Sequence, residues 1–206
     1  MTIKLPVLYN MPKFLNGVMF LHSNRIKQLV LSSMFAALIT VGAFVKIPVP
    51  VVPFTLQFLF TSMAGLLLGA KYGAVSVMIY IMLGLSGVPV FAGGGGVSYI
   101  LQPSFGYMPG FALGAFVTGR IAGTSGNPSY RRLVTANFAG LLIVYAMGMT
   151  YYAIMSKFYL GNPIGLWPLF LYCFILAVPG DIALCLLGAA AAKILIPVIK
   201  ERHFNE

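Results

Sequence analysis

Asp181 is the residue of this sequence with the clearest chemical potential, because it lies in an otherwise apolar stretch, residues 169–187. It is the only carboxylate in the first 200 residues. A carboxylate inside a membrane costs at least about 2.5 kcal/mol, so by default it marks a functional site. Pro179 and Gly180 come directly before it, and they predict a disturbed helix that another backbone or a ligand can approach closely. The alternative is that Asp181 only caps a helix or is satisfied by internal hydroxyls.

The composition predicts the class of protein that positions this carboxylate. The chain is 60% hydrophobic and 8% charged, with a mean hydropathy of +0.95. A soluble domain carries roughly 25% charged residues, so we expect an all-α integral membrane protein in contact with lipid. The net charge of +10 does not indicate nucleic-acid binding, because the basic residues lie between and beyond apolar runs. Cys173 and Cys185 lie within apolar helix and indicate packing rather than a metal site or a catalytic site.

Apolar segments of membrane-spanning character recur six times along the chain. These segments divide the chain into three parts. An N-terminal arm (1–28), either interfacial or disordered, is followed by a transmembrane substrate-binding domain (29–199) and a cytoplasmic tail (200–206). The predicted spans cover about residues 29–45, 54–68, 74–85, 108–121, 133–155 and 171–196.

The distribution of basic residues predicts the orientation of these spans. With a cytoplasmic N-terminus, only Lys46 and Lys157 of the 13 lysines and arginines lie outside, which favours six spans with both termini in the cytoplasm. The proline-rich loop (46–53), the glycine-rich loop (84–106) and the aromatic loop (157–168) then all face outward. Asp181 precedes Lys193 by about 18 Å of helix. We therefore expect a pocket that opens outward beneath the loops, with Asp181 in its wall.

The glycine-rich loop is the most unusual connection. No charged residue occurs between Tyr72 and Gly119, and the middle of this segment is rich in glycine and proline. Irregular backbone at membrane depth is tolerated only where it lines a cavity or is buried in protein. The loop therefore suits a lid over a small, mostly neutral ligand, although a plain hydrophobic hairpin loop is the alternative.

Several stretches together resemble one known family. They are Ile-Pro-Val-Pro-Val-Val-Pro-Phe-Thr-Leu-Gln (47–57), Ala-Gly-Leu-Leu-Leu-Gly (64–69), Gly-Leu-Ser-Gly-Val-Pro-Val-Phe-Ala-Gly-Gly (84–94) and Gly-Tyr (106–107). Across about residues 29–196 the sequence resembles the BioY family, the biotin-binding S components of energy-coupling-factor (ECF) transporters. The resemblance implies six helices in the bacterial inner membrane and a biotin site accessible from outside. It also implies ATP-driven coupling through a transmembrane T component and two ATPase subunits, with no cofactor or metal.

The resemblance also implies roles for particular residues. Asp181 matches an aspartate of the sixth span that binds the ligand, and the loop between the third and fourth spans supplies further polar groups. Family members often carry a lysine three residues after this aspartate, where this chain has Leu184. The ligand carboxylate then stays in water or meets Lys46 or backbone donors of the glycine-rich loop. The small residues expected to contact the T component are Ser32, Ser33, Ala36 and Ala37.

The chemistry of biotin allows a site to be predicted. Its ureido ring carries two N–H donors and a carbonyl, and an ionised aspartate accepts hydrogen bonds without donating them. Asp181 could therefore accept a ureido N–H in a charge-assisted bond, while Gln57, Gln102 or loop amides donate to the carbonyl. Aromatic residues, Trp167 among them, could wall the ring. The predicted substrate-binding residues are Asp181, Gln57, Phe91, Gly93, Gly94, Tyr99, Gln102 and Tyr107.

Three other functions fit parts of the sequence. The Gly-Thr-Ser-Gly motif at residues 123–126 matches the GxSG of intramembrane serine proteases, but both histidines, His22 and His203, lie outside the predicted spans, so Ser125 lacks a base. The chain has no GxxxxGK[ST] motif, so ATP-driven uptake would require partner subunits. Transport by this chain alone, as a solitary facilitator, is therefore the second alternative. An S component for a different vitamin is the third.

Overall fold

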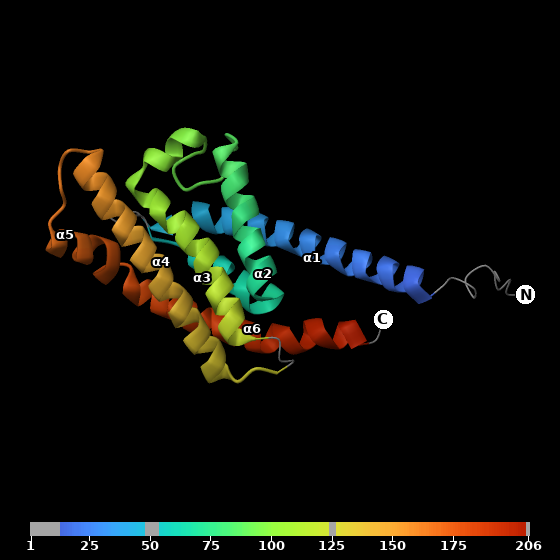
Figure 1. Ribbon diagram of the computed structural model, residues 1–206. Coiled ribbons are helices and arrows are strands. Elements are labelled where there is room, and N and C mark those ends of the chain that lie inside the picture. The colour runs from blue at the N-terminus through green and yellow to red at the C-terminus, as the bar shows by residue number, and fades with distance from the viewer. Residues whose placement is uncertain (1–12, 48–53, 124–126, 205–206) are drawn as a thin grey trace, which may run out of the picture.

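The computed structural model describes residues 13–47, 54–123 and 127–204, with side chains from Arg25 to Ile199. The fold is mostly helical. Its long helices gather into a bundle, and α1 projects beyond the bundle at its N-terminal end (Figure 1). Residues 13–28 of the predicted arm are therefore helical and continuous with the first span. The long helices are α1 (Lys13–Phe44), α2 (Gln57–Leu85), α3 (Tyr107–Ala122), α4 (Tyr130–Phe158) and α6 (Val178–Phe204).

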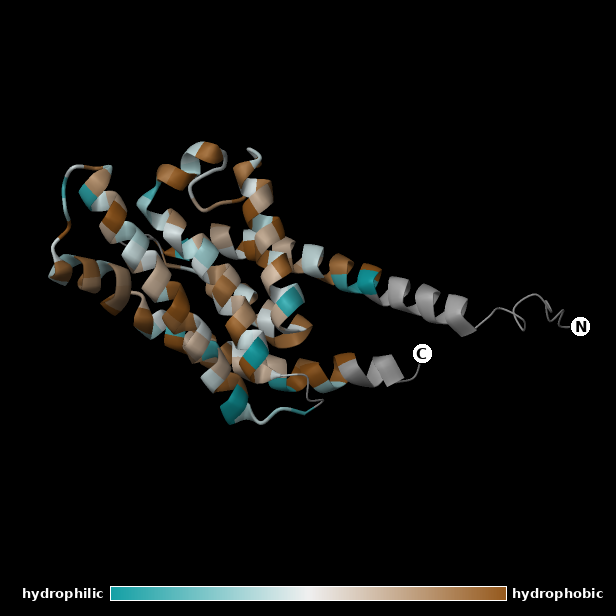
Figure 2. Cartoon of the chain, in the orientation of Figure 1, coloured by the Kyte–Doolittle hydropathy of each residue, from teal (hydrophilic) through white to brown (hydrophobic). Residues whose placement is uncertain are grey.

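Hydrophobic residues occur all along the helices of the bundle (Figure 2), and many of their large side chains are exposed. Leu142 and Ile194, for example, are 67% and 70% exposed. Such a surface suits lipid, because soluble proteins rarely expose large contiguous apolar patches. The helical stretches long and apolar enough to cross a membrane are Arg25–Phe44, Gln57–Leu85, Tyr130–Phe158 and Leu166–Ile199.

The structure therefore shows four candidate spans in the described residues, where the sequence predicts six. Apart from residues 54–56, the predicted spans 54–68 and 74–85 fall within the single helix α2, which is interrupted at Gly69 (φ 79°, ψ 177°). Only glycine adopts such a positive φ readily, so Gly69 permits the interruption. The helix α3 has 16 residues, about 24 Å of rise, which is less than the roughly 30 Å of a hydrocarbon core. The division into six spans stays a prediction.

Small residues allow the two halves of α2 to pack closely against each other and against α3. A Cβ on Gly73 would lie 2.7 Å from the Cα of Gly65, so the two halves of α2 approach each other beside Gly69. A Cβ on Gly119 of α3 would lie 2.4 Å from the backbone nitrogen of Ala70. Backbones come this close only where side chains are small, which is how helices associate in lipid.

The glycine-rich loop and the described ends of the proline-rich loop, both expected on the outer side, contact the helices. Lys46–Ile47 (β1) pairs antiparallel with Phe54–Thr55 (β2), with Lys46 opposite Thr55, and residues 48–53 lie outside the described residues. In the glycine-rich loop the fully buried Phe91 ring lies 5.3 Å from the Tyr80 ring and 4.5 Å from the Tyr99 ring, centroid to centroid. The loop is therefore anchored to α2 by an aromatic core. It continues through 3-10 turns at Val97–Leu101 and Pro103–Gly106.

The last predicted span, 171–196, is not one regular helix. A short helix α5 (Leu166–Phe170) is followed by a π-helical segment (Leu171–Ile175), and α6 begins at Val178. Pro179 lacks the N–H that a continuous helix would need, but this is tolerated in the first turn of α6. The break that Pro179 predicts is confirmed, and it places Asp181 in the first turn of α6.

Candidate ligand-binding site

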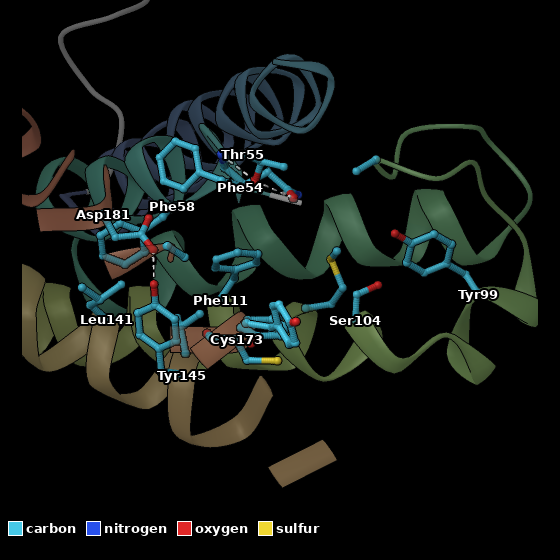
Figure 3. A pocket seen from close by; sticks show the side chains of 17 residues that line it. Phe54, Thr55, Phe58, Tyr99, Ser104, Phe111, Leu141, Tyr145, Cys173 and Asp181 are labelled. Carbon is cyan, nitrogen blue, oxygen red and sulfur yellow. Dashed lines mark hydrogen bonds between the residues drawn. The ribbon is translucent and has the colours of Figure 1, made fainter. Parts of the chain in front are cut away.

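A cavity lies among α2, α3, α4 and α6 and reaches the glycine-rich loop (Figure 3). Its space measures about 680 Å³, open solvent at the mouth included. Like small-molecule sites in general, it combines apolar walls with a few polar groups. The lining residues are Phe54, Thr55, Gln57, Phe58, Ala92, Tyr99, Ser104, Tyr107, Met108, Phe111, Leu141, Val144, Tyr145, Tyr172, Cys173, Ala177 and Asp181.

Asp181 lies in the wall of this cavity and is 8% exposed. The hydroxyl of Tyr145 donates a hydrogen bond to its Oδ2, the dashed line in Figure 3. Within the described part of the chain no basic side chain pairs with the carboxylate and no backbone N–H of α6 caps it. The positive end of the α6 dipole favours the negative charge. An internal hydroxyl therefore satisfies one oxygen, as the alternative reading proposed, while Oδ1 has no hydrogen-bond donor among the described side chains.

Gln57 forms a second polar point in the cavity wall. Its Nε2 donates to the Tyr80 hydroxyl at 2.8 Å, and its Oε1 accepts from the Thr55 hydroxyl at 3.3 Å. An amide nitrogen has two N–H groups, so one remains after the bond to Tyr80. Gln57 can therefore donate to a carbonyl in the cavity.

Apolar and aromatic side chains form most of the remaining wall. Phe54, Phe58 and Phe111 come from β2, α2 and α3 and surround the cavity in Figure 3. A Cβ on Gly180 would lie 2.6 Å from the Phe54 ring. The sequence predicts another backbone or a ligand beside Gly180, whereas the neighbour in the structure is the side-chain ring of Phe54.

Tyr107 begins α3 and turns its ring into the bundle. Its hydroxyl donates to the Cys173 carbonyl at 3.4 Å, and its ring meets that of Tyr145 edge-on at 6.5 Å. A Cβ on Gly148 would fall 2.4 Å from the Tyr107 ring, so this glycine makes the room for it. Tyr107 thereby connects α3, α4 and the π-helical segment on one side of the cavity.

Residues of the glycine-rich loop close one end of the cavity. Ala92, Tyr99 and Ser104 contribute to its lining. Burial raises the pKa of the Tyr99 phenol, so its hydroxyl stays protonated at neutral pH and can donate a hydrogen bond. The ammonium of Lys46 reaches this loop from β1 and donates to the Ala92 carbonyl at 2.8 Å.

Half of the predicted substrate-binding residues come together at the cavity. Asp181, Gln57, Tyr99 and Tyr107 all line it. They come from α6, α2, the glycine-rich loop and the start of α3. These four residues are far apart in the sequence, and the fold brings them to one cavity. Their contact with a ligand stays a prediction.

The other predicted binding residues do not line the cavity. Phe91 is fully buried behind Tyr99, and Gly93 and Gly94 form the turn beside it. Gln102 is exposed near that turn, with its side chain 3.6 Å from the position of a Cβ on Gly93. Trp167 is 67% exposed and remote from the lining.

The small residues predicted to contact a T component lie on two faces of α1. Ser32 and Ala36 are buried, and the Ser32 hydroxyl donates to the backbone carbonyls of Gln28 and Tyr72. Ser33 and Ala37 lie on the exposed face, in a shallow apolar groove with Ile26, Leu29, Val30 and Met34. Of the four, only Ser33 and Ala37 are open to an outside partner in this structure.

Sequence reasoning missed Tyr145, the partner of Asp181. The signal for it was present, because small residues at Ala136, Gly140 and Gly148 follow a helical spacing and mark a buried face of α4. A tyrosine within such a stripe must find an acceptor for its hydroxyl.

Metal binding and covalent catalysis would each require particular side chains. Among the described residues no group of three His, Cys, Asp or Glu side chains could hold a metal ion. Cys173 and Cys185 are buried free thiols. Ser125 lies outside the described residues. The cavity therefore offers hydrogen bonds and apolar contact.

Comparison with known proteins identifies relatives of this chain. A family model described as the BioY family matches residues 13–201. The "Probable biotin transporter BioY" of Lysinibacillus sphaericus is 42% identical over 172 residues, covering 84% of this chain and 88% of the relative. The "Biotin transporter BioY" of Thermotoga maritima is 44% identical over 124 residues, covering 60% of this chain and 72% of the relative.

A solved structure has a similar fold. It is described as the crystal structure of the S-component for biotin from an ECF-type ABC transporter. It superposes with a TM-score of 0.72 at 28% sequence identity and covers 84% of this chain and 92% of its own.

Proposed function

This chain belongs to the BioY family, and on that premise we propose that it captures biotin from outside the cell as the binding component of a vitamin uptake transporter. It is a multi-pass bacterial membrane protein. Because the family consists of transporter components, the protein is not an enzyme. The family resemblance read from the sequence is thereby confirmed.

The observation that carries the proposed ligand is the half-satisfied carboxylate. Tyr145 donates to one oxygen of Asp181, and the second oxygen has no donor among the described side chains. Leaving a buried charged group without its hydrogen bonds costs free energy. A ligand N–H that donates to the second oxygen would remove this cost, which favours binding there. A ureido ring supplies such N–H groups, and the charge-assisted bond is stronger than a neutral one.

The other polar groups suit the rest of the ring. The remaining N–H of Gln57 can donate to the ureido carbonyl, and Tyr99 contributes a neutral hydroxyl to the lining. The Phe58 and Phe111 walls suit the thioether ring and the aliphatic chain, which need contact without hydrogen bonds. The cavity thus matches both the polar and the apolar parts of biotin.

We infer a six-span topology with both termini in the cytoplasm. The interruption of α2 at Gly69 supports two spans in that helix, and Lys71 lies beside this corner, on the expected inner side. The assignment leaves Lys46 and Lys157 as the outward basic residues. Residues 1–28 and 200–206 then form the cytoplasmic ends.

Energy coupling is expected to come from partners. The chain carries no phosphate-binding GxxxxGK[ST] motif, and its structural neighbour is described as part of an ECF-type ABC transporter. We propose a transmembrane T component and two ATPase subunits as partners, with Ser33 and Ala37 in the groove of α1 as contact residues. Solitary transport and a different vitamin ligand are not favoured by the comparisons.

Ligand-dependent stabilisation tests the proposed function. Purified protein in detergent is heated with biotin, desthiobiotin and a panel of other vitamins. A ligand that binds only the folded state raises the unfolding temperature by mass action. We expect biotin to give the largest shift, and a larger shift with another vitamin would overturn the ligand assignment. Uptake of labelled biotin by cells lacking every coupling ATPase would instead support solitary transport.

A further inference from the structure

The cavity wall has an unbalanced charge. Among the described residues that line it, Asp181 is the one carboxylate, and none is a lysine, arginine or histidine. A ligand that carries its own carboxylate therefore brings a second negative charge into a space that already holds one. Like charges at short range disfavour each other in a low-dielectric site. A cation near the mouth would remove this penalty.

Two observations place Lys46 at the mouth. Its backbone pairs with that of Thr55 across the two-stranded ladder, and Thr55 lines the cavity. Its ammonium donates to the carbonyl of Ala92, another lining residue, at 2.8 Å. The stem of Lys46 thus bridges from the hairpin to the glycine-rich loop, and its charged end lies at the cavity rim.

We propose that Lys46 binds the carboxylate of the ligand, a role that rests on the proposed function. An ammonium has three donors, and among the described residues Lys46 uses one of them, in its hydrogen bond to the neutral carbonyl of Ala92. A carboxylate is a stronger acceptor than that carbonyl, so it forms a charge-assisted bond with a donor that Ala92 leaves free. The ureido ring then lies at Asp181 and the acidic end at Lys46.

This assignment predicts selectivity for the acid over its neutral derivatives. The bond to Ala92 holds the ammonium at the rim before the ligand arrives, which reduces the entropy lost on binding. Lys46 is exposed, so water and salt weaken the interaction compared with a buried pair. The contribution is therefore moderate and falls as salt concentration rises.

Lys157 provides a matched control. It is the other basic residue expected on the outer side, and its side chain packs over the Phe158 ring at 5.4 Å rather than at the cavity. Replacing it by methionine removes the same charge from the same side of the membrane. Any effect of the overall surface charge on binding therefore appears in both variants.

The experiment measures binding of biotin and of biotinamide, its uncharged primary amide, by calorimetry in detergent. We expect Lys46→Met to weaken biotin binding about fivefold or more and to leave biotinamide within about twofold. Lys46→Arg should keep most of the preference for biotin, and Lys157→Met should change neither affinity. Raising the salt concentration should shrink the biotin preference of the wild-type protein.

The outcomes separate this role from the proposed function. Equal loss for both ligands in Lys46→Met would mean that Lys46 only holds the loop at Ala92, and it would overturn the role proposed here. Unchanged biotin affinity would overturn it too. Wild-type protein that binds neither ligand would overturn the proposed function itself, and this role with it.

Discussion

The Tyr145 hydroxyl donates a hydrogen bond to Oδ2 of Asp181, so α4 and α6 meet at a buried charge in the cavity wall (Figure 3). The Tyr145 ring is held in turn, edge-on at 5.0 Å from the Phe174 ring and 6.5 Å from the Tyr107 ring. The carboxylate is therefore oriented before any ligand arrives. A site whose polar groups are held by supporting contacts loses less entropy on binding.

Asp181→Asn should weaken biotin binding without unfolding the protein. The variant keeps an acceptor for the Tyr145 hydroxyl but loses the charge that strengthens the bond to a ureido N–H. Hydrogen bonds to charged groups contribute about 1.5–3 kcal/mol, so we expect a loss of about tenfold or more. Calorimetry in detergent measures the affinity, and a thermal melt confirms folding. Unchanged affinity would remove Asp181 from the site.

Tyr145→Phe should lower both stability and affinity. It leaves Oδ2 of Asp181 without its donor, and an unsatisfied buried group costs about 1–3 kcal/mol. Tyr152→Phe is the control, because Tyr152 lies on the same helix outside the cavity lining. In the double variant with Asp181→Asn the losses should be less than additive, since both changes act on one interaction. Strict additivity in thermal and binding measurements would contradict a shared role.

Phe91→Ala should lower stability and also binding, although Phe91 does not line the cavity. Its fully buried ring supports Tyr99 and fills the space left by Gly84, whose Cβ would lie 2.0 Å from it. Large-to-Ala changes in a core cost about 3–5 kcal/mol, so the unfolding temperature should fall clearly. Gln102→Ala, in the same loop but exposed, should leave it unchanged. Equal melting of the two variants would show that the loop is not anchored by this ring.

The sequence was sufficient for the features that depend on residue type alone. The apolar composition predicts the membrane class, and the isolated Asp181 predicts a polar point that the structure places in a cavity wall. The break before α6 follows from Pro179, because a residue without an N–H is tolerated in the first turn of a helix but not in its interior.

Features that depend on packing between helices were harder to predict from the sequence. Phe91 and Tyr99 have similar local sequence signals, yet one fills the core and the other lines the cavity. Ser32 and Ser33 are neighbours, yet a rotation of about 100° per residue puts one against α2 and the other outside. The hydrogen bond between Tyr145 and Asp181 joins residues 36 positions apart, which local patterns do not reveal.

Biotin should protect Cys173 from a thiol reagent. Cys173 lines the cavity, whereas Cys185, the other cysteine of the chain, is fully buried outside the lining. A small neutral maleimide that enters the cavity should therefore react at Cys173, and bound biotin should slow the reaction about in proportion to occupancy. In Cys185→Ser the labelling should persist and remain sensitive to biotin, while Cys173→Ser should abolish it. Mass spectrometry reports the modified residue, and labelling of Cys173 at the same rate with saturating biotin would place the ligand elsewhere in the molecule.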